Sequence, residues 1–238
     1  MRAIVKVAWT PDPVLVLASP DGFDRVPLET GRELEYEIGK ERRCTGYHRD
    51  MGEHVPCPGF RELETGDQCR ECREKDIYTG WRTGKASPGF DAEYSVYLAQ
   101  AGEKVKVGVA RTGRLEERWL EQGADYAVEV FSELTGDGAL EREKEISSEG
   151  IPERIRKEHK LEAAEPRLSG LMDEHGLSGE VRSINAEKEF RAKTVDRTGL
   201  LPDIEHVKGQ MISDGRRAVA FTSGKVLKPA EQTGLTQF

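Results

Sequence analysis

Long hydrophobic runs are missing from this 238-residue sequence, and no stretch approaches the ~18 apolar residues that a membrane-spanning helix needs. The first residues, MRAIVKVAWTPDP, include a lysine within a short apolar run and no small-residue cleavage site, so we expect neither secretion nor membrane insertion. An excess of basic side chains is missing too. The sequence has 36 Lys and Arg against 44 Asp and Glu, a net charge of −8, which argues against a generic nucleic-acid binder but permits a local basic cleft. We expect a soluble, cytoplasmic protein of one or two domains.

Cysteine is scarce, and all four cysteines fall within one short stretch: Cys44, Cys57, Cys69 and Cys72. The C-x-x-C spacing of the last pair presents two thiolates to one tetrahedral ion. Glycine and proline surround the first two cysteines, as is typical of irregular knuckles that lack a core of their own. Four thiolates would close the coordination shell, so the pattern predicts a structural Zn²⁺ ribbon that leaves no open position for catalysis.

Other states of these cysteines stay open. Two disulfides or four free thiols are the alternatives, and disulfides are rare in proteins without a secretion signal. His48 and His54 lie between Cys44 and Cys57 and could replace one cysteine ligand, or they could be ordinary loop histidines.

Alternating apolar runs in the middle of the chain predict a β-hairpin. The runs, 94–99 and 105–110, flank Ala101-Gly102, which we take as the turn. This turn places Tyr97 opposite Lys106 on one face, with the valines of the second strand on the other face.

Similar patterns predict the elements around this hairpin. We expect strands at 3–8, 13–18 and 126–131, a helix at 115–122 that Gly123 ends, and helical segments at 138–160 and 161–175. Residues 196–238 return to short strands with glycine turns, such as Asp214-Gly215. The predicted fold class is therefore α+β, with a small, mainly antiparallel three-stranded sheet (94–99, 105–109, 126–131) and helices packed on it. A β and four-cysteine zinc module (1–90) and a C-terminal β module (196–238) would flank this α+β domain (91–195).

The hairpin and the helix after it resemble the core of the GIY-YIG nuclease superfamily. V-Y-L, V-K-V-G and R-x-x-x-R-W occur in the order of that pattern. Tyr97 matches the first tyrosine, Gly108 the glycine, and Arg118 the helix arginine, with Arg114 one turn away. Glu143, within Ala139-Leu-Glu-Arg-Glu143-Lys-Glu-Ile146, matches the metal-binding glutamate, although Glu141 and Glu145 lie close enough to compete. Ser95 and Lys106 depart from the pattern, where the superfamily has glycine and tyrosine.

The chain as a whole resembles a prokaryotic group, the domain of unknown function 2797 family. The resemblance rests on Cys44-Thr-Gly-Tyr47, Pro56-Cys57, Gln68-Cys69, the R-W-x-x-Q-G-A segment and Lys208-Gly-Gln210. It covers most of residues 44–225 and implies no function.

The GIY-YIG resemblance implies a role for each matched residue. Glu143 would hold Mg²⁺ or Mn²⁺, and Arg118 would bind the phosphate oxygens in a bidentate manner. Tyr97 would orient or deprotonate the attacking water, provided that nearby cations lower its phenol pKa from ~10. Lys106, in place of a tyrosine, would act in the same catalytic group. A set of basic residues could contact a nucleic-acid backbone: Arg111, Arg114, Arg154, Arg156 and Lys157, with Lys160 next to them.

Each of these residues also has a structural interpretation. Tyr97 could be a half-buried strand aromatic, Arg118 a helix ion-pair partner and Glu143 a solvated carboxylate. The basic run 154–160 alternates with glutamates and could be a salt-bridged helix face. The leading function is metal-dependent hydrolysis of DNA or RNA; the alternatives are a non-catalytic nucleic-acid-binding protein and a protein-interaction module. The oligomeric state is left open.

Overall fold

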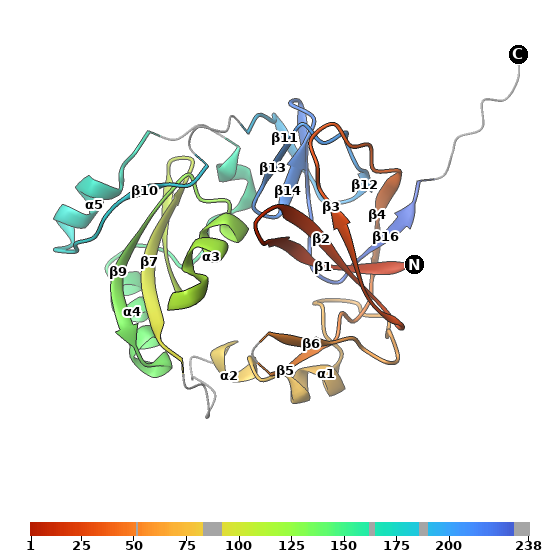
Figure 1. Ribbon diagram of the computed structural model, residues 1–238, viewed down its shortest axis with the longest axis horizontal. Helices are drawn as coiled ribbons and strands as arrows, with labels where there is room; N and C mark the ends of the chain where they lie inside the picture. Colours follow the sequence, from red (N-terminus) through yellow and green to blue (C-terminus); the bar gives the residue numbers. More distant parts are fainter. Residues whose placement is uncertain (51, 83–91, 162–164, 186–189, 231–238) are drawn as a thin grey trace, which may run out of the picture.

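The computed structural model describes residues 1–50, 52–82, 92–161, 165–185 and 190–230 as a strand-rich α+β chain. Figure 1 shows a sheet with helices on both of its faces, beside a group of strands that contains both ends of the described chain. No helix in the described part is long and apolar enough to cross a membrane.

The largest sheet has six strands and combines the beginning and the end of the described chain. Its order is β12 (Gly199–Leu200), β4 (Tyr36–Arg42), β16 (Lys225–Pro229), β1 (Arg2–Trp9), β2 (Pro13–Ser19) and β3 (Gly22–Pro27). β16 pairs with both β1 and β4, so segments from the first and third predicted modules share one sheet. The domain boundaries at residues 90 and 195 stay a prediction.

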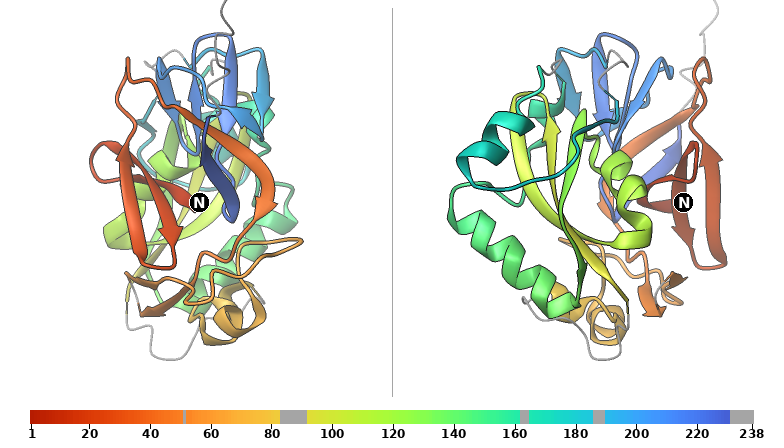
Figure 2. Two further views of the ribbon diagram at one scale, coloured as in Figure 1. Left: turned by 90° about the vertical axis from the view of Figure 1, so that its right-hand side faces the viewer. Right: turned by 60° about the vertical axis from the view of Figure 1, so that its left-hand side comes forward.

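The second sheet contains the predicted hairpin. Its order is β10 (Arg182–Ser183), β9 (Tyr126–Leu134), β7 (Tyr94–Ala101) and β8 (Lys104–Arg111), and all its pairs are antiparallel. Helix α3 (Leu115–Gln122) covers one face, while α4 (Gly136–Ser148) and α5 (Leu168–Glu174) cover the other (Figure 2). Side chains alternate accordingly, because Tyr97 packs with Trp119 of α3 and Leu98 packs with Ile146 of α4.

Two smaller β units complete the chain. One sheet has the order β11 (Thr194–Asp196), β15 (Arg217–Ala220), β14 (Met211–Ser213) and β13 (His206–Lys208). The hairpin of β5 (Tyr47–Asp50) and β6 (Glu53–Val55) lies with the short helices α1 (Arg70–Lys75) and α2 (Thr79–Arg82). The glycine turn expected at Asp214-Gly215 connects β14 to β15.

The register of the β7–β8 hairpin differs from the prediction by two residues. Ala101 pairs with Lys104, so the turn is Gly102-Glu103, and Tyr97 lies opposite Gly108 while Lys106 lies opposite Ala99. Tyr97 and Lys106 still share the α3 face, as expected. The shift explains the glycine of the V-K-V-G motif, because a Cβ at Gly108 would lie 2.6 Å from the Tyr97 hydroxyl oxygen.

The prediction of a helix over 138–160 is wrong in its second half. α4 ends at Ser148, and Gly150 adopts a positive φ of 106° that stops the helix. The chain then passes beside β8, where the Pro152 carbonyl accepts a hydrogen bond of 3.0 Å from the Val107 amide. A single 3₁₀ turn, η2 (Lys157–Lys160), follows, and the described part of the second helical segment contains only α5.

The K-G-Q segment joins the sheets at the carboxyl end of α3. The Lys208 ammonium lies 2.6 Å from the Asp125 carboxylate, and both side chains are buried. Gly209 packs against Gly123, and its carbonyl accepts a hydrogen bond of 3.1 Å from the Trp9 indole. The Gln210 side chain bonds to both backbone groups of Val7 in β1, at 2.6 and 2.8 Å. This motif is therefore a structural junction.

We predict that Gly209→Ala destabilises the protein by about 1–3 kcal/mol, because a residue with a Cβ is strained at this positive φ. Gly209 has φ 57°, and a Cβ there would lie 2.8 Å from the Gly123 nitrogen. Urea denaturation would measure the loss. Gly170→Ala in α5 is the control, since a Cβ at Gly170 meets no atom within 4 Å. Equal stability of Gly209→Ala and the wild type would contradict the prediction.

Candidate active site and metal centre

The four residues predicted to be catalytic come from four different elements and converge beside α3. Tyr97 lies on β7, Lys106 on β8, Arg118 on α3 and Glu143 on α4. Arg118 interacts with Tyr97, and the charges of Arg118 and Glu143 both act on Lys106. β8 is the edge strand of its sheet, and the Val109 backbone in this strand forms a hydrogen bond with Glu143.

Tyr97 is held rigidly at the base of this group. It is 1% exposed, and its ring lies edge-on to Trp119 with the centroids 6.4 Å apart. Burial raises the pKa of the Tyr97 phenol, and the neighbouring Arg118 offsets only part of that effect. The net pKa of Tyr97 lies above its ordinary value, so Tyr97 keeps its proton near neutral pH.

At Lys106, the protein shifts the pKa downward. It is 8% exposed, its ammonium donates a hydrogen bond of 2.8 Å to the Glu153 carbonyl, and it lies 5.8 Å from the centre of the Tyr97 ring. Burial and the positive charge of Arg118 lower the pKa of Lys106 to about 8. A lysine with this pKa has a larger neutral fraction near neutral pH than an ordinary surface lysine has.

A buried carboxylate orients Arg118. Glu121 is 6% exposed and lies 3.1 Å from the Arg118 guanidinium, one helical turn along α3. The same carboxylate contacts Lys6 of β1 and lies 3.9 Å from Arg114. The Arg118 side chain is 45% exposed, so part of its guanidinium remains open to solvent and to a ligand.

Glu143 is half-buried, in the middle of α4. Burial and the nearby Glu153 raise its pKa, while Lys106, Arg118 and a hydrogen bond from the Val109 backbone oppose that rise. The competitors Glu141 and Glu145 are exposed, and Glu145 forms an ion pair of 2.7 Å with Arg142. Glu143 is thus the carboxylate of this helix that faces the cations.

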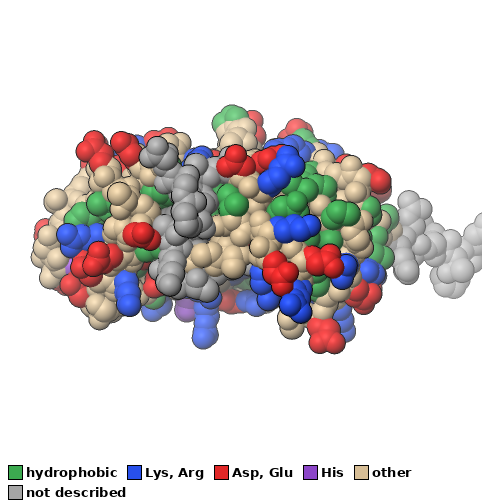
Figure 3. Space-filling view, turned by 90° about the horizontal axis from the view of Figure 1, so that it is seen from below, with side chains coloured by type: hydrophobic (Ala, Val, Ile, Leu, Met, Phe, Trp, Pro, Cys, Tyr) green, Lys and Arg blue, Asp and Glu red, His purple; other side chains and the backbone are tan. Residues whose placement is uncertain are grey.

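The other predicted nucleic-acid contacts differ in burial and in their partners. Arg114 forms an ion pair with Glu117 at 2.5 Å, Arg111 is half-buried, and Arg154 and Arg156 are exposed. Lys157 instead turns inward and donates a hydrogen bond of 2.6 Å to the Phe221 carbonyl. Figure 3 shows acidic and basic side chains interspersed on the face it presents, without a continuous basic patch there.

The four cysteines form one buried group. Their sulfur atoms all lie within 4.8 Å of one another, and all four are free thiols. Tetrahedral zinc–thiolate geometry, with Zn–S bonds of about 2.3 Å, needs sulfurs separated by somewhat less than that limit. The Cys69 amide donates to Cys44 Sγ at 3.2 Å, as in metal-binding knuckles. The donor set fits a Zn²⁺ ion.

The surroundings of the thiols favour this interpretation. Among the described apolar side chains, only Tyr47 and Leu63 pack against the group, so it has little hydrophobic core of its own. His48 and His54 stack on each other at 4.4 Å, and the described metal-binding group contains the four cysteines without them.

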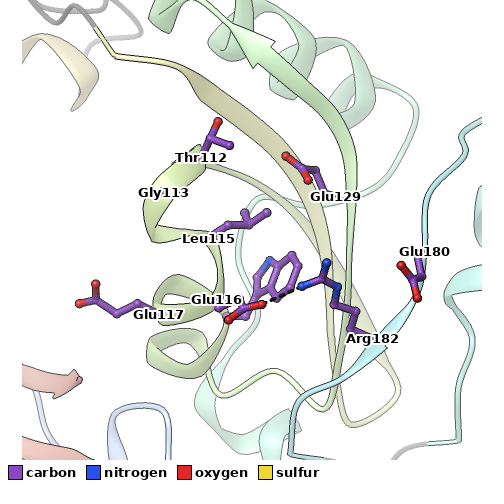
Figure 4. Close-up of a pocket in the computed structure, with 9 residues that line it drawn as sticks. Thr112, Gly113, Leu115, Glu116, Glu117, Glu129, Glu180 and Arg182 are labelled. Carbon is purple, nitrogen blue, oxygen red and sulfur yellow. Dashed lines mark hydrogen bonds and ion pairs between the residues drawn. The ribbon is translucent and has the colours of Figure 1, made fainter. Parts of the chain in front are cut away.

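A hollow of about 580 Å³ lies on the β9–β10 side of α3 (Figure 4). Glu129 of β9, Arg182 of β10 and Glu116 of α3 line it, and Arg182 and Glu116 form an ion pair of 2.7 Å. None of the four converging residues lines this hollow, so the candidate site is separate from it.

A family model described as "Protein of unknown function (DUF2797)" matches residues 31–200, more than half of the chain. The chain belongs to the DUF2797 family. No curated protein and no solved structure matches it. The matched range includes the four cysteines and all four converging residues, whereas the K-G-Q segment lies beyond it.

Lys160 is the functional candidate of this DUF2797 chain that the sequence did not separate from its neighbours. Its ammonium donates to the carbonyl of Gln122, the last residue of α3, and the charges of Lys106 and Arg118 act on it. The 3₁₀ spacing of Lys157 and Lys160 is the signal that could have identified it, since residues i and i+3 eclipse in such a turn.

The pKa of Lys160 predicts a pH-dependent effect on stability. Burial and the charge of Lys106 lower this pKa from 10.5 to about 8 in the folded protein. Between those values the unfolded chain binds more protons, so Lys160 adds stability as the pH rises. Lys160→Met lacks this gain. From pH 7 to pH 10, we therefore expect the unfolding free energy of the wild type to rise by about 1–3 kcal/mol relative to that of Lys160→Met.

Urea denaturation at the two pH values would measure this difference. Lys144→Met, on the exposed surface of α4, is the matched control and should show no such change. A difference for Lys160→Met that stays constant between pH 7 and pH 10 would argue against a lowered pKa.

Proposed function

We propose that this DUF2797 protein hydrolyses nucleic-acid phosphodiesters with a divalent metal ion, at a GIY-YIG-like site. The observation that carries the proposal is the convergence of Tyr97, Lys106, Arg118 and Glu143. The resemblance matched Tyr97, Arg118 and Glu143 to the pattern and marked Lys106 as its departure. The strand order β8–β7–β9, with α3 and α4 on opposite faces, also supports a GIY-YIG-like core.

The site has the groups needed to bind and polarise a phosphodiester. The open part of the Arg118 guanidinium can donate two parallel hydrogen bonds to phosphate oxygens, and Glu121 holds it in place. Glu143 would hold Mg²⁺ or Mn²⁺, which supplies charge stabilisation for the leaving 3′ oxygen when bound. A single carboxylate is sufficient for this ion, because water fills the other positions.

We assign the proton transfer to Lys106. In its neutral form, its Nζ lone pair can accept a proton from the attacking water, and the pKa near 8 makes that form accessible. The Tyr97 hydroxyl remains protonated and orients the water or a phosphate oxygen. This assignment accounts for the lysine at the second tyrosine position of the pattern.

The four cysteines would hold a structural Zn²⁺. A closed shell of four thiolates leaves no position for substrate, so the ion would stabilise the fold of the β5–β6 and α1 region. Its role is then separate from that of the catalytic metal.

Replacing Glu143 tests the proposed hydrolysis. Labelled single-stranded, duplex and branched DNA and RNA would be incubated with the full-length, zinc-loaded protein and Mg²⁺ or Mn²⁺. We expect cleavage that Glu143→Gln reduces on the order of 10²–10³-fold, since the carboxylate that holds the metal is lost.

Glu141→Gln is the matched control, because this exposed glutamate lies on the same helix and should leave cleavage unchanged. Binding without any cleavage would instead favour a catalytically silent nucleic-acid-binding protein. Neither binding nor cleavage would favour a protein-interaction module.

Metal analysis tests the structural ion. We predict one zinc per chain by elemental analysis, and loss of zinc and of a cooperative thermal transition in Cys57→Ser. His54→Ala should retain the zinc, because the four sulfurs complete the ligand set. Wild-type protein that folds and contains no zinc would overturn the assignment.

A further inference from the structure

Three inward-facing lysines, at and next to the candidate site, bond to backbone carbonyls. The charge of Glu143 acts on Lys106 and that of Glu158 on Lys157, but neither forms a direct ion pair with it in the described part of the chain. Lys106, Lys157 and Lys160 each donate to a backbone carbonyl, from Glu153, Phe221 and Gln122 respectively. Within the described residues, none of the three forms an ion pair. Burial makes an unpaired ammonium costly, so such groups are normally paired with an anion.

Other cations in the same region do have such partners. Lys208 pairs with Asp125, and Arg118 and Lys6 share Glu121. The carboxylate within η2 also has another partner, because Glu158 faces outward and forms an ion pair of 2.6 Å with Arg197. The two lysines of the turn therefore form no ion pair with a described carboxylate, although acidic residues are abundant in the sequence.

The 3₁₀ turn explains why two lysines face inward together. With three residues per turn, Lys157 and Lys160 eclipse on one face, while Glu158 projects from another. In the sequence, these alternating charges resembled a salt-bridged helix face. In the structure, the two lysines lie on the inside of the turn and Glu158 lies on the outside.

The cations form a track that is longer than one phosphate. Lys160 is anchored at Gln122, four residues after Arg118, or about 6 Å along the axis of α3. Lys157 extends the track to Phe221, at the end of β15. At the other end, the exposed Arg154 acts on Lys106.

We propose that Lys157 and Lys160 form a second phosphate subsite, next to the one at Arg118, and that the ligand is a nucleic-acid strand presenting at least two consecutive phosphates. This inference rests on the proposed function and specifies its substrate. It assigns strand binding to two inward-facing lysines, anchored to the carbonyls of Gln122 and Phe221. A mononucleotide fills one subsite only.

Strand binding can be measured independently of cleavage. Fluorescence anisotropy would follow fluorescein-labelled (dT)12 binding to the full-length, zinc-loaded protein at several NaCl concentrations, without added Mg²⁺ or Mn²⁺. We expect the slope of log K against log [NaCl] to become shallower by about 1.4 in Lys157→Gln/Lys160→Gln, because each lost phosphate contact on a single strand removes about 0.7.

Two variants separate charge from folding. Lys157→Arg/Lys160→Arg keeps both charges and should retain the wild-type slope. Lys144→Gln/Lys193→Gln removes two exposed lysines elsewhere and should also retain it. In competition, pTpT should bind at least 10-fold more weakly to the double glutamine variant than to the wild type, whereas pT should bind equally to both.

The outcomes distinguish this inference from the proposed hydrolysis. An unchanged slope in the double glutamine variant, or a wild-type protein that does not bind the strand, overturns the second subsite. If Glu143-dependent cleavage occurs with an unchanged slope, the subsite fails and the hydrolysis stands. If the slope becomes shallower but no cleavage is found, the subsite stands and the hydrolysis fails.

Discussion

The close packing of Gly123 against Gly209 is the contact on which the arrangement of the candidate site depends. A helix can approach another chain segment this closely only where neither has a Cβ, and both glycines have a positive φ. The buried pair of Lys208 and Asp125 lies beside the glycines and neutralises both charges. Together these contacts fix the carboxyl end of α3 against the strands contributed by both ends of the described chain.

That junction also determines the electrostatics of the site. Glu121, near the end of α3, contacts Lys6 of β1 and Arg118, so the six-stranded sheet helps to orient the arginine beside Tyr97. The last carbonyl of the same helix accepts a hydrogen bond from the Lys160 ammonium. The carboxyl end of a helix carries a partial negative charge, which favours the Lys160 ammonium at this position although the charge of Arg118 opposes it.

Local patterns predicted the elements that surround the site. The alternating runs predicted β7 and β8, and the 115–122 helix with Gly123 as its stop is confirmed as α3 and its left-handed cap. The pattern could not fix the hairpin register, because the alternative turns preserve the same alternation of faces. The extra length assigned to α4 arose because charged residues after Gly150 favour helix locally, while the edge of β8 offered the Pro152 carbonyl a partner.

By itself, the sequence determined that the chain is α+β, that four cysteines could share one metal ion, and which tyrosine, arginine and glutamate match a known nuclease pattern. These conclusions follow from spacing along the chain, which sets local geometry and ligand identity. Only the tertiary structure decided that the pKa of Tyr97 is raised while that of Lys106 is lowered, and that Lys157 and Lys160 turn inward to backbone carbonyls. Burial and through-space charge set these properties, and both depend on segments far apart in the sequence that meet only after folding.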